Sequence, residues 1–119
     1  MRRLRSTLWA MMASCAFCGP VTAVTQEEMI RLGRDIYHDK SRGNCISCHN
    51  ISDPVTNLPG NQGPMMIAMK QRYPDRRKLR AQVWDATAAN PLSIMPPVGK
   101  HWILSEDEID AVVEYIYQY

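Results

Sequence analysis

Five consecutive residues, Cys45-Ile46-Ser47-Cys48-His49, constrain this chain of 119 residues more than any other feature. Two cysteines three positions apart, followed at once by a histidine, form the attachment pattern of c-type haem. In a helical turn Cys45, Cys48 and His49 lie at i, i+3 and i+4 and share one face. The two thiols can then bond one edge of the haem while His49 reaches the iron. The sequence therefore predicts one covalently bound haem c, with His49 as an iron ligand.

Three other uses of a Cys-x-x-Cys pair compete with haem attachment. A zinc site needs further Cys or His ligands at short spacing, which the sequence lacks. A thioredoxin-type redox pair is expected beside a strand–helix unit, and no strand-like alternation of any length appears. A disulfide between Cys45 and Cys48 is the third alternative.

Met95 is the predicted second iron ligand. It lies in the run Ser93-Ile94-Met95-Pro96-Pro97, where the prolines favour an extended backbone and stiffen the loop. Ligation by histidine and methionine raises the potential of the iron relative to two nitrogen ligands, which suits electron transfer. No catalytic residue is assigned to this chain.

Other residues could take the place of Met95. Ligation by two histidines is the alternative, with His101 favoured over His38 as the second ligand. Three methionines lie closer to His49 in the sequence, and packing on a short helix explains them better: Met65, Met66 and Met69.

The first 23 residues have the pattern of an export signal. Three arginines precede a mostly apolar stretch at 7–17, and the small residues before Ala23 fit a signal-peptidase site. The apolar stretch is shorter than the roughly 20 residues that a helix needs to cross a bilayer. We expect a cleaved signal peptide at 1–23, a cytochrome c domain at 24–119 and a periplasmic location. The alternatives are an uncleaved membrane anchor and a lipoprotein acylated at Cys15.

Export would change both the charge and the cysteine count of the chain. The formal net charge of +2 arises mostly from arginines in the signal, so the sequence does not indicate nucleic-acid binding. Cys15 and Cys18 would leave with the signal, and Cys45 and Cys48 would be the two remaining cysteines.

Capping boxes mark the beginnings of two helices near the ends of the mature chain. Thr25 precedes Glu28 by three positions, and Ser105 precedes Glu108 in the same way. The first helix places Gly33 and Tyr37 on one face, and the last carries an apolar stripe at Ile109, Val112, Val113 and Ile116. We expect the two helices to cross, with Gly33 and Tyr37 against Val112 and Tyr115.

Two shorter helices are predicted between them, at 64–73 and 78–89. Proline and glycine indicate loops at 52–63 and 92–101. The predicted fold is therefore all-α, a small class I cytochrome c fold whose terminal helices cross around one haem.

Several residues are candidates for the surroundings of the haem. A ligating histidine needs a partner for its other ring nitrogen, and a carbonyl at Gly63 or Pro64 could accept from Nδ1–H of His49. Four residues could line the pocket or bind the haem propionates, although ordinary packing or exposure explains each of them better: Tyr73, Arg80, Trp84 and Trp102. A basic cluster at 72–80 is either a solvated helix start, or a docking patch or support for the propionates.

The order of these motifs resembles the small class I cytochromes c: Gly33-x-x-x-Tyr37, the haem-attachment pattern, Gly63-Pro64 and Met95-Pro96-Pro97. Longer runs resemble one branch, the SoxX subunits of the SoxAX complexes of bacterial sulfur oxidation. These runs lie at 43–45, 58–64, 69–75, 79–87, 90–91, 95–101 and 103–109. The stretch between Tyr37 and Cys45 is longer than in mitochondrial-type cytochromes.

The resemblance implies an enzyme subunit, an L-cysteine S-thiosulfotransferase that is not catalytically complete alone. Complexes of the SoxAX type couple thiosulfate to a cysteine of the SoxYZ carrier protein and release two electrons. The reactive cysteine of that family belongs to the larger SoxA subunit, and both cysteines left in this chain after export would be consumed by haem attachment. The resemblance therefore implies a heterodimer with a SoxA-type cytochrome, from which this chain relays electrons to a soluble cytochrome c. The alternatives are a free-standing periplasmic electron carrier and a monohaem subunit of another periplasmic dehydrogenase.

Overall fold

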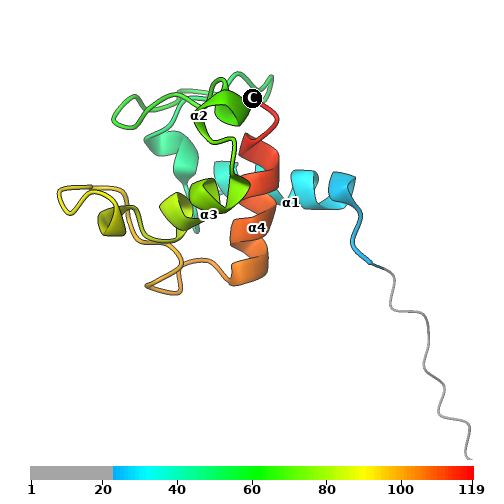
Figure 1. Ribbon diagram of the computed structural model, residues 1–119. Coiled ribbons are helices and arrows are strands. Elements are labelled where there is room, and N and C mark those ends of the chain that lie inside the picture. Colours follow the sequence, from blue (N-terminus) through cyan, green and yellow to red (C-terminus); the bar gives the residue numbers. More distant parts are fainter. Residues whose placement is uncertain (1–22) are drawn as a thin grey trace, which may run out of the picture.

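The structure, a computed structural model, describes residues 23–119, which fold almost entirely as helices and loops (Figure 1). In this part of the chain a single parallel bridge between Ile51 and Met66 is the whole of the β-structure. The α-helices are α1 (Gln26–His38), α2 (Met69–Arg72), α3 (Arg76–Trp84) and α4 (Glu106–Ile116), with 3-10 turns η1 (Cys45–Ser47) and η2 (Ala86–Ala88). The predicted all-α fold is confirmed.

The predicted signal peptide, including Cys15 and Cys18, lies outside the described residues except for Ala23. Within 23–119, every helix falls short of the length and apolarity that crossing a membrane requires.

Helices α1 and α4 begin where the capping boxes predicted. Thr25 and Glu28 bond each other's backbone N–H reciprocally, and Ser105 and Glu108 do the same. Each cap satisfies N–H groups that the first turn of a helix leaves without partners.

The terminal helices cross at Gly33, as predicted. A Cβ atom at Gly33 would lie 1.9 Å from the carbonyl oxygen of Ala111 and 2.9 Å from Cβ of Tyr115, so only glycine permits this approach. Beside the crossing, the rings of Tyr37 and Tyr115 meet edge to face with centroids 5.5 Å apart. Val112 is 2% exposed and completes the predicted contact region.

Asp53, a buried carboxylate from the loop after the Cys-x-x-Cys-His turn, joins both ends of the domain. It accepts hydrogen bonds from Tyr115 Oη (2.7 Å), Tyr119 Oη (3.1 Å) and Arg34 Nη2 (3.0 Å). Burial by itself would raise the pKa of Asp53, but these bonds and one from the N–H of Val55 hold it lower, at about 2. The carboxylate therefore stays charged and ties α1, α4 and the loop together.

The two central helices are shorter than predicted. Residues 64–68 are not helical, because Met66 pairs with Ile51 and Ala68 adopts a left-handed backbone (φ 52°), so α2 begins only at Met69. The predicted helix at 78–89 is divided at Asp85, where the backbone turns extended (φ −154°, ψ 91°) between α3 and η2.

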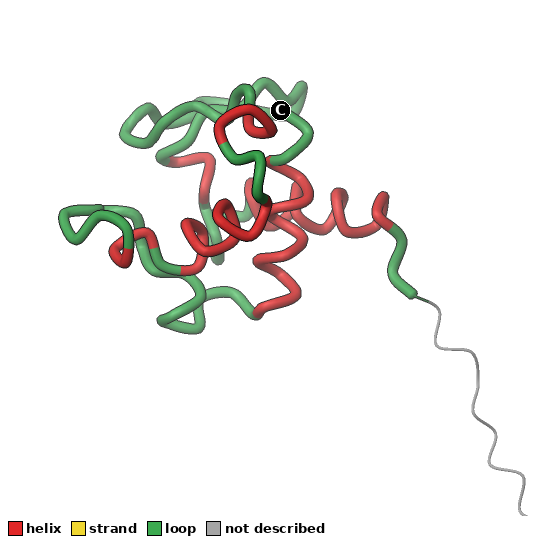
Figure 2. The backbone as a smooth tube through the Cα atoms, in the orientation of Figure 1, coloured by secondary structure: helices red, strands yellow, loops and turns green. Residues whose placement is uncertain are grey.

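Two long irregular segments, 39–68 and 85–105, connect these helices, and Figure 2 shows both as loops interrupted only by short turns. The predicted loops at 52–63 and 92–101 lie within them. In Figure 1 the loop that follows α3, coloured yellow, extends away from the helices. The first segment carries the Cys-x-x-Cys-His pattern and the second carries Met95.

Candidate haem site

The attachment pattern forms the helical turn that its spacing predicts. The N–H of Cys48 donates to the carbonyl of Cys45 at 3.1 Å, and the N–H of His49 donates to the same oxygen at 2.9 Å. Cys45, Cys48 and His49 all line one cavity. Burial raises the pKa of the Cys45 thiol to about 11, so the unreacted side chain is neutral at physiological pH.

This cavity has a volume of about 590 Å³ and is enclosed by residues from both loops and from α3 and α4. The buried part of its lining is apolar and is formed by Met66, Met69, Leu79, Val83, Val98, Val112 and Ile116. Among the described residues that line it, none is a carboxylate and Arg72 is the single permanent cation. The cavity thus suits a large apolar group that carries negative charge at its edge.

His49 is fixed by contacts to the backbone. Its Nδ1 lies 2.8 Å from the carbonyl oxygen of Pro64, the partner predicted for it. Since a carbonyl only accepts, Nδ1 carries the proton and Nε2 is left as the nitrogen with a lone pair for a metal. A Cβ at Gly63 would lie 2.3 Å from the imidazole, and Tyr37 Oη donates to the His49 carbonyl at 2.8 Å. These contacts fix both the ring and the backbone of His49.

Met95 lines the same cavity from the opposite loop and is half-buried. Its N–H donates to Ser93 Oγ at 3.2 Å. Of the two histidine alternatives, His101 is exposed and His38 lies 3.3 Å from Tyr115 Oη, and neither lines the cavity. The arrangement favours Met95, and its role as iron ligand stays a prediction.

The other methionines are placed differently from one another. Met65 is 39% exposed, whereas Met66 and Met69 are buried and line the cavity. The sulfur of Met69 accepts a hydrogen bond from Arg72 at 3.4 Å. Packing therefore explains Met66 and Met69, although Met65 and Met66 precede the helix on which they were predicted to lie.

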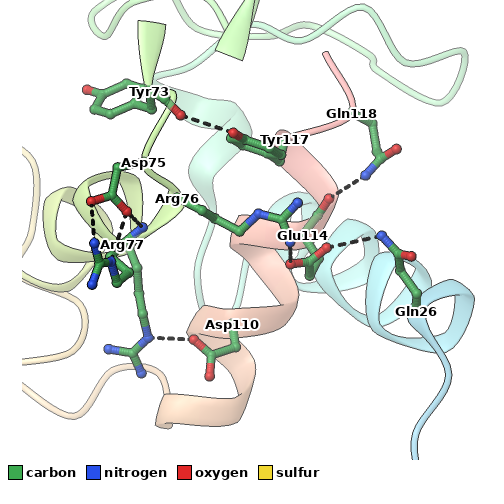
Figure 3. Close-up of polar contacts among 10 residues, drawn as sticks. Gln26, Tyr73, Asp75, Arg76, Arg77, Asp110, Glu114, Tyr117 and Gln118 are labelled. Carbon is green, nitrogen blue, oxygen red and sulfur yellow. Dashed lines mark hydrogen bonds and ion pairs between the residues drawn. The ribbon is translucent and has the colours of Figure 1, made fainter. Parts of the chain in front are cut away.

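Most of the basic cluster at 72–80 is paired with acidic side chains. Arg76 pairs with Glu114 of α4, and Arg77 pairs with Asp75 at 3.0 Å (Figure 3). Arg80 bonds Glu106 at 3.0 Å and Asp110 at 2.5 Å. Arg72 is different, because it bonds the Met65 carbonyl and the Met69 sulfur, both neutral, and lines the cavity.

The four residues considered for the haem pocket lie in different places. Tyr73 lines the cavity, whereas Arg80 and Trp84 line a second, open hollow beside α3. Trp102 is 77% exposed and lines neither. Its backbone is left-handed (φ 56°), and its ring meets that of Trp84 edge to face at 6.4 Å.

A family model matches residues 28–116, which is most of the chain, and is described as cytochrome C oxidase, cbb3-type, subunit III. The chain belongs to this family of c-type cytochrome domains. Its cofactor is therefore haem c, and its activity is electron transfer. A curated relative, an uncharacterized lipoprotein of Aquifex aeolicus (strain VF5), is 29% identical over 76 residues. The match covers 64% of this chain, and the chain spans 36% of the length of that relative.

The residues of this cytochrome domain fit haem c. Two thiols and an imidazole lie on one turn, and a thioether lies on the loop across the cavity. The apolar lining suits the porphyrin, and the unpaired guanidinium of Arg72 suits its propionates. Cys45 and Cys48 would hold the ring covalently, and His49 and Met95 would bind the iron.

Sequence reasoning missed two features of the cytochrome site. Tyr37 was predicted only as a core residue, yet its hydroxyl holds the backbone of His49, a contact between elements that local patterns do not encode. Asp85, Lys100 and Gly99 close the loop that carries Met95. The run Asp85-Ala86-Thr87 has a capping pattern that could have indicated a break there.

Proposed function

We propose that this chain carries one haem c, bonded to Cys45 and Cys48 with His49 and Met95 as iron ligands, and acts as the electron-relay subunit of a periplasmic thiosulfate-oxidising complex of the SoxAX type. The observation that supports the ligand set is the meeting of these four side chains at one apolar cavity without carboxylates. The runs that resemble SoxX support the choice of complex, and they extend over most of residues 43–109.

The residues of this chain have distinct tasks in the proposed relay. Bound haem supplies one-electron oxidation and reduction at its iron. The Pro64 carbonyl holds the proton on Nδ1 of His49, which fixes the tautomer and the orientation of the ring. Arg72 neutralises negative charge at the edge of the cavity, and the apolar lining excludes water.

The enzymatic part of the proposal places the sulfur chemistry elsewhere. The thiols of Cys45 and Cys48 are committed to haem attachment, so the reactive cysteine of the complex itself belongs to the SoxA-type partner. The complex joins thiosulfate to a cysteine of a SoxYZ-type carrier, and the two electrons released leave through this chain one at a time to a soluble cytochrome c. A free-standing electron carrier, or a subunit of another periplasmic dehydrogenase, would use the same haem site.

Ligation is tested with the ferric haem protein and the variants Met95→Ala and His101→Ala. We expect Met95→Ala to abolish the red-region sulfur-to-iron charge-transfer band and to open the iron to added imidazole. His101→Ala is the matched control and should leave the spectrum unchanged. A band that survives in Met95→Ala would exclude Met95 as the ligand.

The complex is tested by co-expression with a SoxA-type chain and export through a haem-attaching pathway. We expect a stoichiometric heterodimer that reduces a soluble cytochrome c only when thiosulfate and a SoxYZ-type carrier are both present. A stable monomer with no affinity for the SoxA-type chain would remove the subunit proposal and leave the free-standing carrier. Intact mass of the exported protein tests signal cleavage after Ala23, acylation at Cys15 and the count of one haem together.

A further inference from the structure

Met95 lies on a loop whose two ends are joined. The chain leaves α3 at Trp84 and returns at Gly99, whose N–H donates to the Trp84 carbonyl at 3.1 Å. The N–H of Lys100 approaches the same oxygen at 3.4 Å. The segment 84–99 is thus an Ω-type loop, an irregular excursion with adjacent ends.

The base of this loop is buried and its tip is exposed. Ala86 and Val98, at the two sides of the base, are 0% and 6% exposed. Leu92 and Ile94, next to Met95, are 88% and 80% exposed. Figure 1 shows the same division, since the yellow loop extends away from the helices that carry its base. Leu92, Ile94 and Met95 all line the cavity, so within the polypeptide the contacts that fix the course of this loop are those at its base.

One carboxylate joins both sides of that base. Asp85 Oδ1 accepts hydrogen bonds from the N–H (3.0 Å) and the hydroxyl of Thr87 on the outgoing side. Its Oδ2 accepts from Lys100 Nζ at 3.1 Å on the returning side. The carboxylate side chain is 12% exposed and the lysine side chain 59% exposed, so the pair is partly shielded from solvent. Asp85 and Lys100 together form what we call the loop clasp.

We propose that the loop clasp, Asp85 with Lys100, keeps Met95 on the iron, so that these two residues set how often the methionine leaves. While the clasp is closed, Met95 lies on a short excursion with fixed ends. When it opens, the returning side keeps its backbone bonds to Trp84 but loses its side-chain constraint, and holding the thioether at one point costs more conformational entropy. Both are positioning residues, since neither lines the cavity. The inference rests on the proposed ligation by Met95 and is independent of the role in sulfur oxidation.

The test measures how fast imidazole, at saturating concentration, replaces Met95 in the ferric haem protein. The variants are Asp85→Asn, which retains a capping side chain but loses the charge, and Lys100→Gln. Asp75→Asn is the matched control, because Asp75 also caps a helix, accepting from the N–H of Arg77 at 3.0 Å, and also pairs with a cation. Because the ion pair is only partly shielded from solvent, we expect imidazole to replace Met95 about two- to fivefold faster in both clasp variants than in the parent protein. The rate in the control should not change.

Further variants separate the clasp from a general loosening of the fold. Lys100→Arg keeps the positive charge and should restore most of the slow replacement. Asp85→Asn combined with Lys100→Gln should be no faster than the faster single variant, because the two substitutions remove the same interaction.

The proposal is overturned if imidazole replaces Met95 in Asp85→Asn and Lys100→Gln no faster than in Asp75→Asn. It is overturned as well if the effects of the two substitutions add in the double variant. It is also overturned if Lys100→Gln, a change at a largely exposed side chain, prevents haem attachment while Asp75→Asn does not. Failure of the ligation itself looks different. In that case the parent protein lacks the charge-transfer band and Met95→Ala leaves its spectrum unchanged.

Discussion

His49 and Met95 line the same cavity, but different kinds of contact hold them in place. The histidine side rests on backbone, with the Pro64 carbonyl on one ring nitrogen, Tyr37 on the His49 carbonyl and Gly63 against the ring. The methionine side is a loop with an exposed tip, joined to the domain only at its base.

If His49 and Met95 are the iron ligands, as proposed, this difference indicates which of them can exchange. Displacing His49 requires breaking contacts that also belong to the core between α1 and α4. Displacing Met95 requires only movement of a loop, and local opening at few contacts has a low free energy. We therefore expect the histidine side to determine whether the haem protein folds, and the methionine side to determine the reactivity of the iron.

The strongest test of this contrast is Gly63→Ala. The added methyl group would lie 2.3 Å from the His49 ring, which cannot move away without losing its bond to Pro64. We expect the free energy of unfolding of the haem protein to fall by about 3 kcal/mol, the upper range for overpacking a fixed site. Guanidinium unfolding measures it, with Asn61→Ala at a nearby exposed position as control. If Gly63→Ala were as stable as its control, the contacts around His49 would adjust to an added methyl group as readily as the loop does.

The second test removes the charge of Asp53, the carboxylate that ties α1, α4 and the loop after the Cys-x-x-Cys-His turn together. The pKa of Asp53 in the fold, about 2, lies below the roughly 3.9 of an unfolded aspartate, so its carboxylate stabilises the fold fully above about pH 4 and loses this effect as the pH falls toward 2. We expect Asp53→Asn to lower the free energy of unfolding by about 2 kcal/mol at neutral pH and by much less near pH 2. Denaturant titrations at several pH values measure this, with Asp35→Asn on the exposed side of α1 as control. A deficit that does not change with pH would contradict the charged network.

The accuracy of the predictions from the sequence also differs between the histidine side and the methionine side. On the histidine side, local patterns were enough: the two capping boxes, the Cys-x-x-Cys-His turn and the carbonyl partner of His49 lie where they were predicted. The contacts that were missed join distant parts of the chain. Met66 leaves the predicted helix to pair with Ile51.

On the methionine side, closure of the loop overrides local propensity. Asp85 interrupts a sequence that favours helix because its extended backbone lets the chain turn out and return to Lys100. The exposed position of Trp102 has the same origin, since its left-handed backbone belongs to the turn that follows Gly99. Pro96, Pro97 and Gly99 predict a loop before Trp102, but they do not predict that Trp102 itself takes the left-handed position.

The third test applies the same substitution to the methionine side. In Gly99→Ala the methyl group would lie 2.3 Å from the half-buried Trp84 ring and 2.9 Å from the end of the Ile109 side chain, and neither neighbour is held by a hydrogen bond as the His49 ring is. We expect a loss of about 1 kcal/mol in the free energy of unfolding, the lower range for overpacking. The charge-transfer band should weaken because the base of the Met95 loop shifts. His101→Ala is the control for the same loop, and a fall in stability as large as that of Gly63→Ala would remove the contrast between the two sides.

The smallest expected effect tests how the methionine side is joined to the rest of the domain. Arg76 of α3 pairs with Glu114 of α4, which also accepts from Gln26 of α1 at 3.5 Å (Figure 3). Because the Arg76 side chain is 45% exposed, we expect Arg76→Gln to cost about 0.5 kcal/mol of unfolding free energy, and most of this cost should be lost at about 1 M salt.

The same variant distinguishes two ways in which α3 could be anchored. Leu79 and Val83 of α3 are 3% and 7% exposed, so apolar packing rather than the Arg76–Glu114 pair should hold α3 in place. Imidazole should then replace Met95 at the parental rate in Arg76→Gln, at low and at high salt. Replacement that is faster in the variant than in the parent protein at the same salt concentration would mean that ion pairs between α3 and α4 control the loop, and the exchange of Met95 would then depend on the whole helix and not on the base of the loop alone.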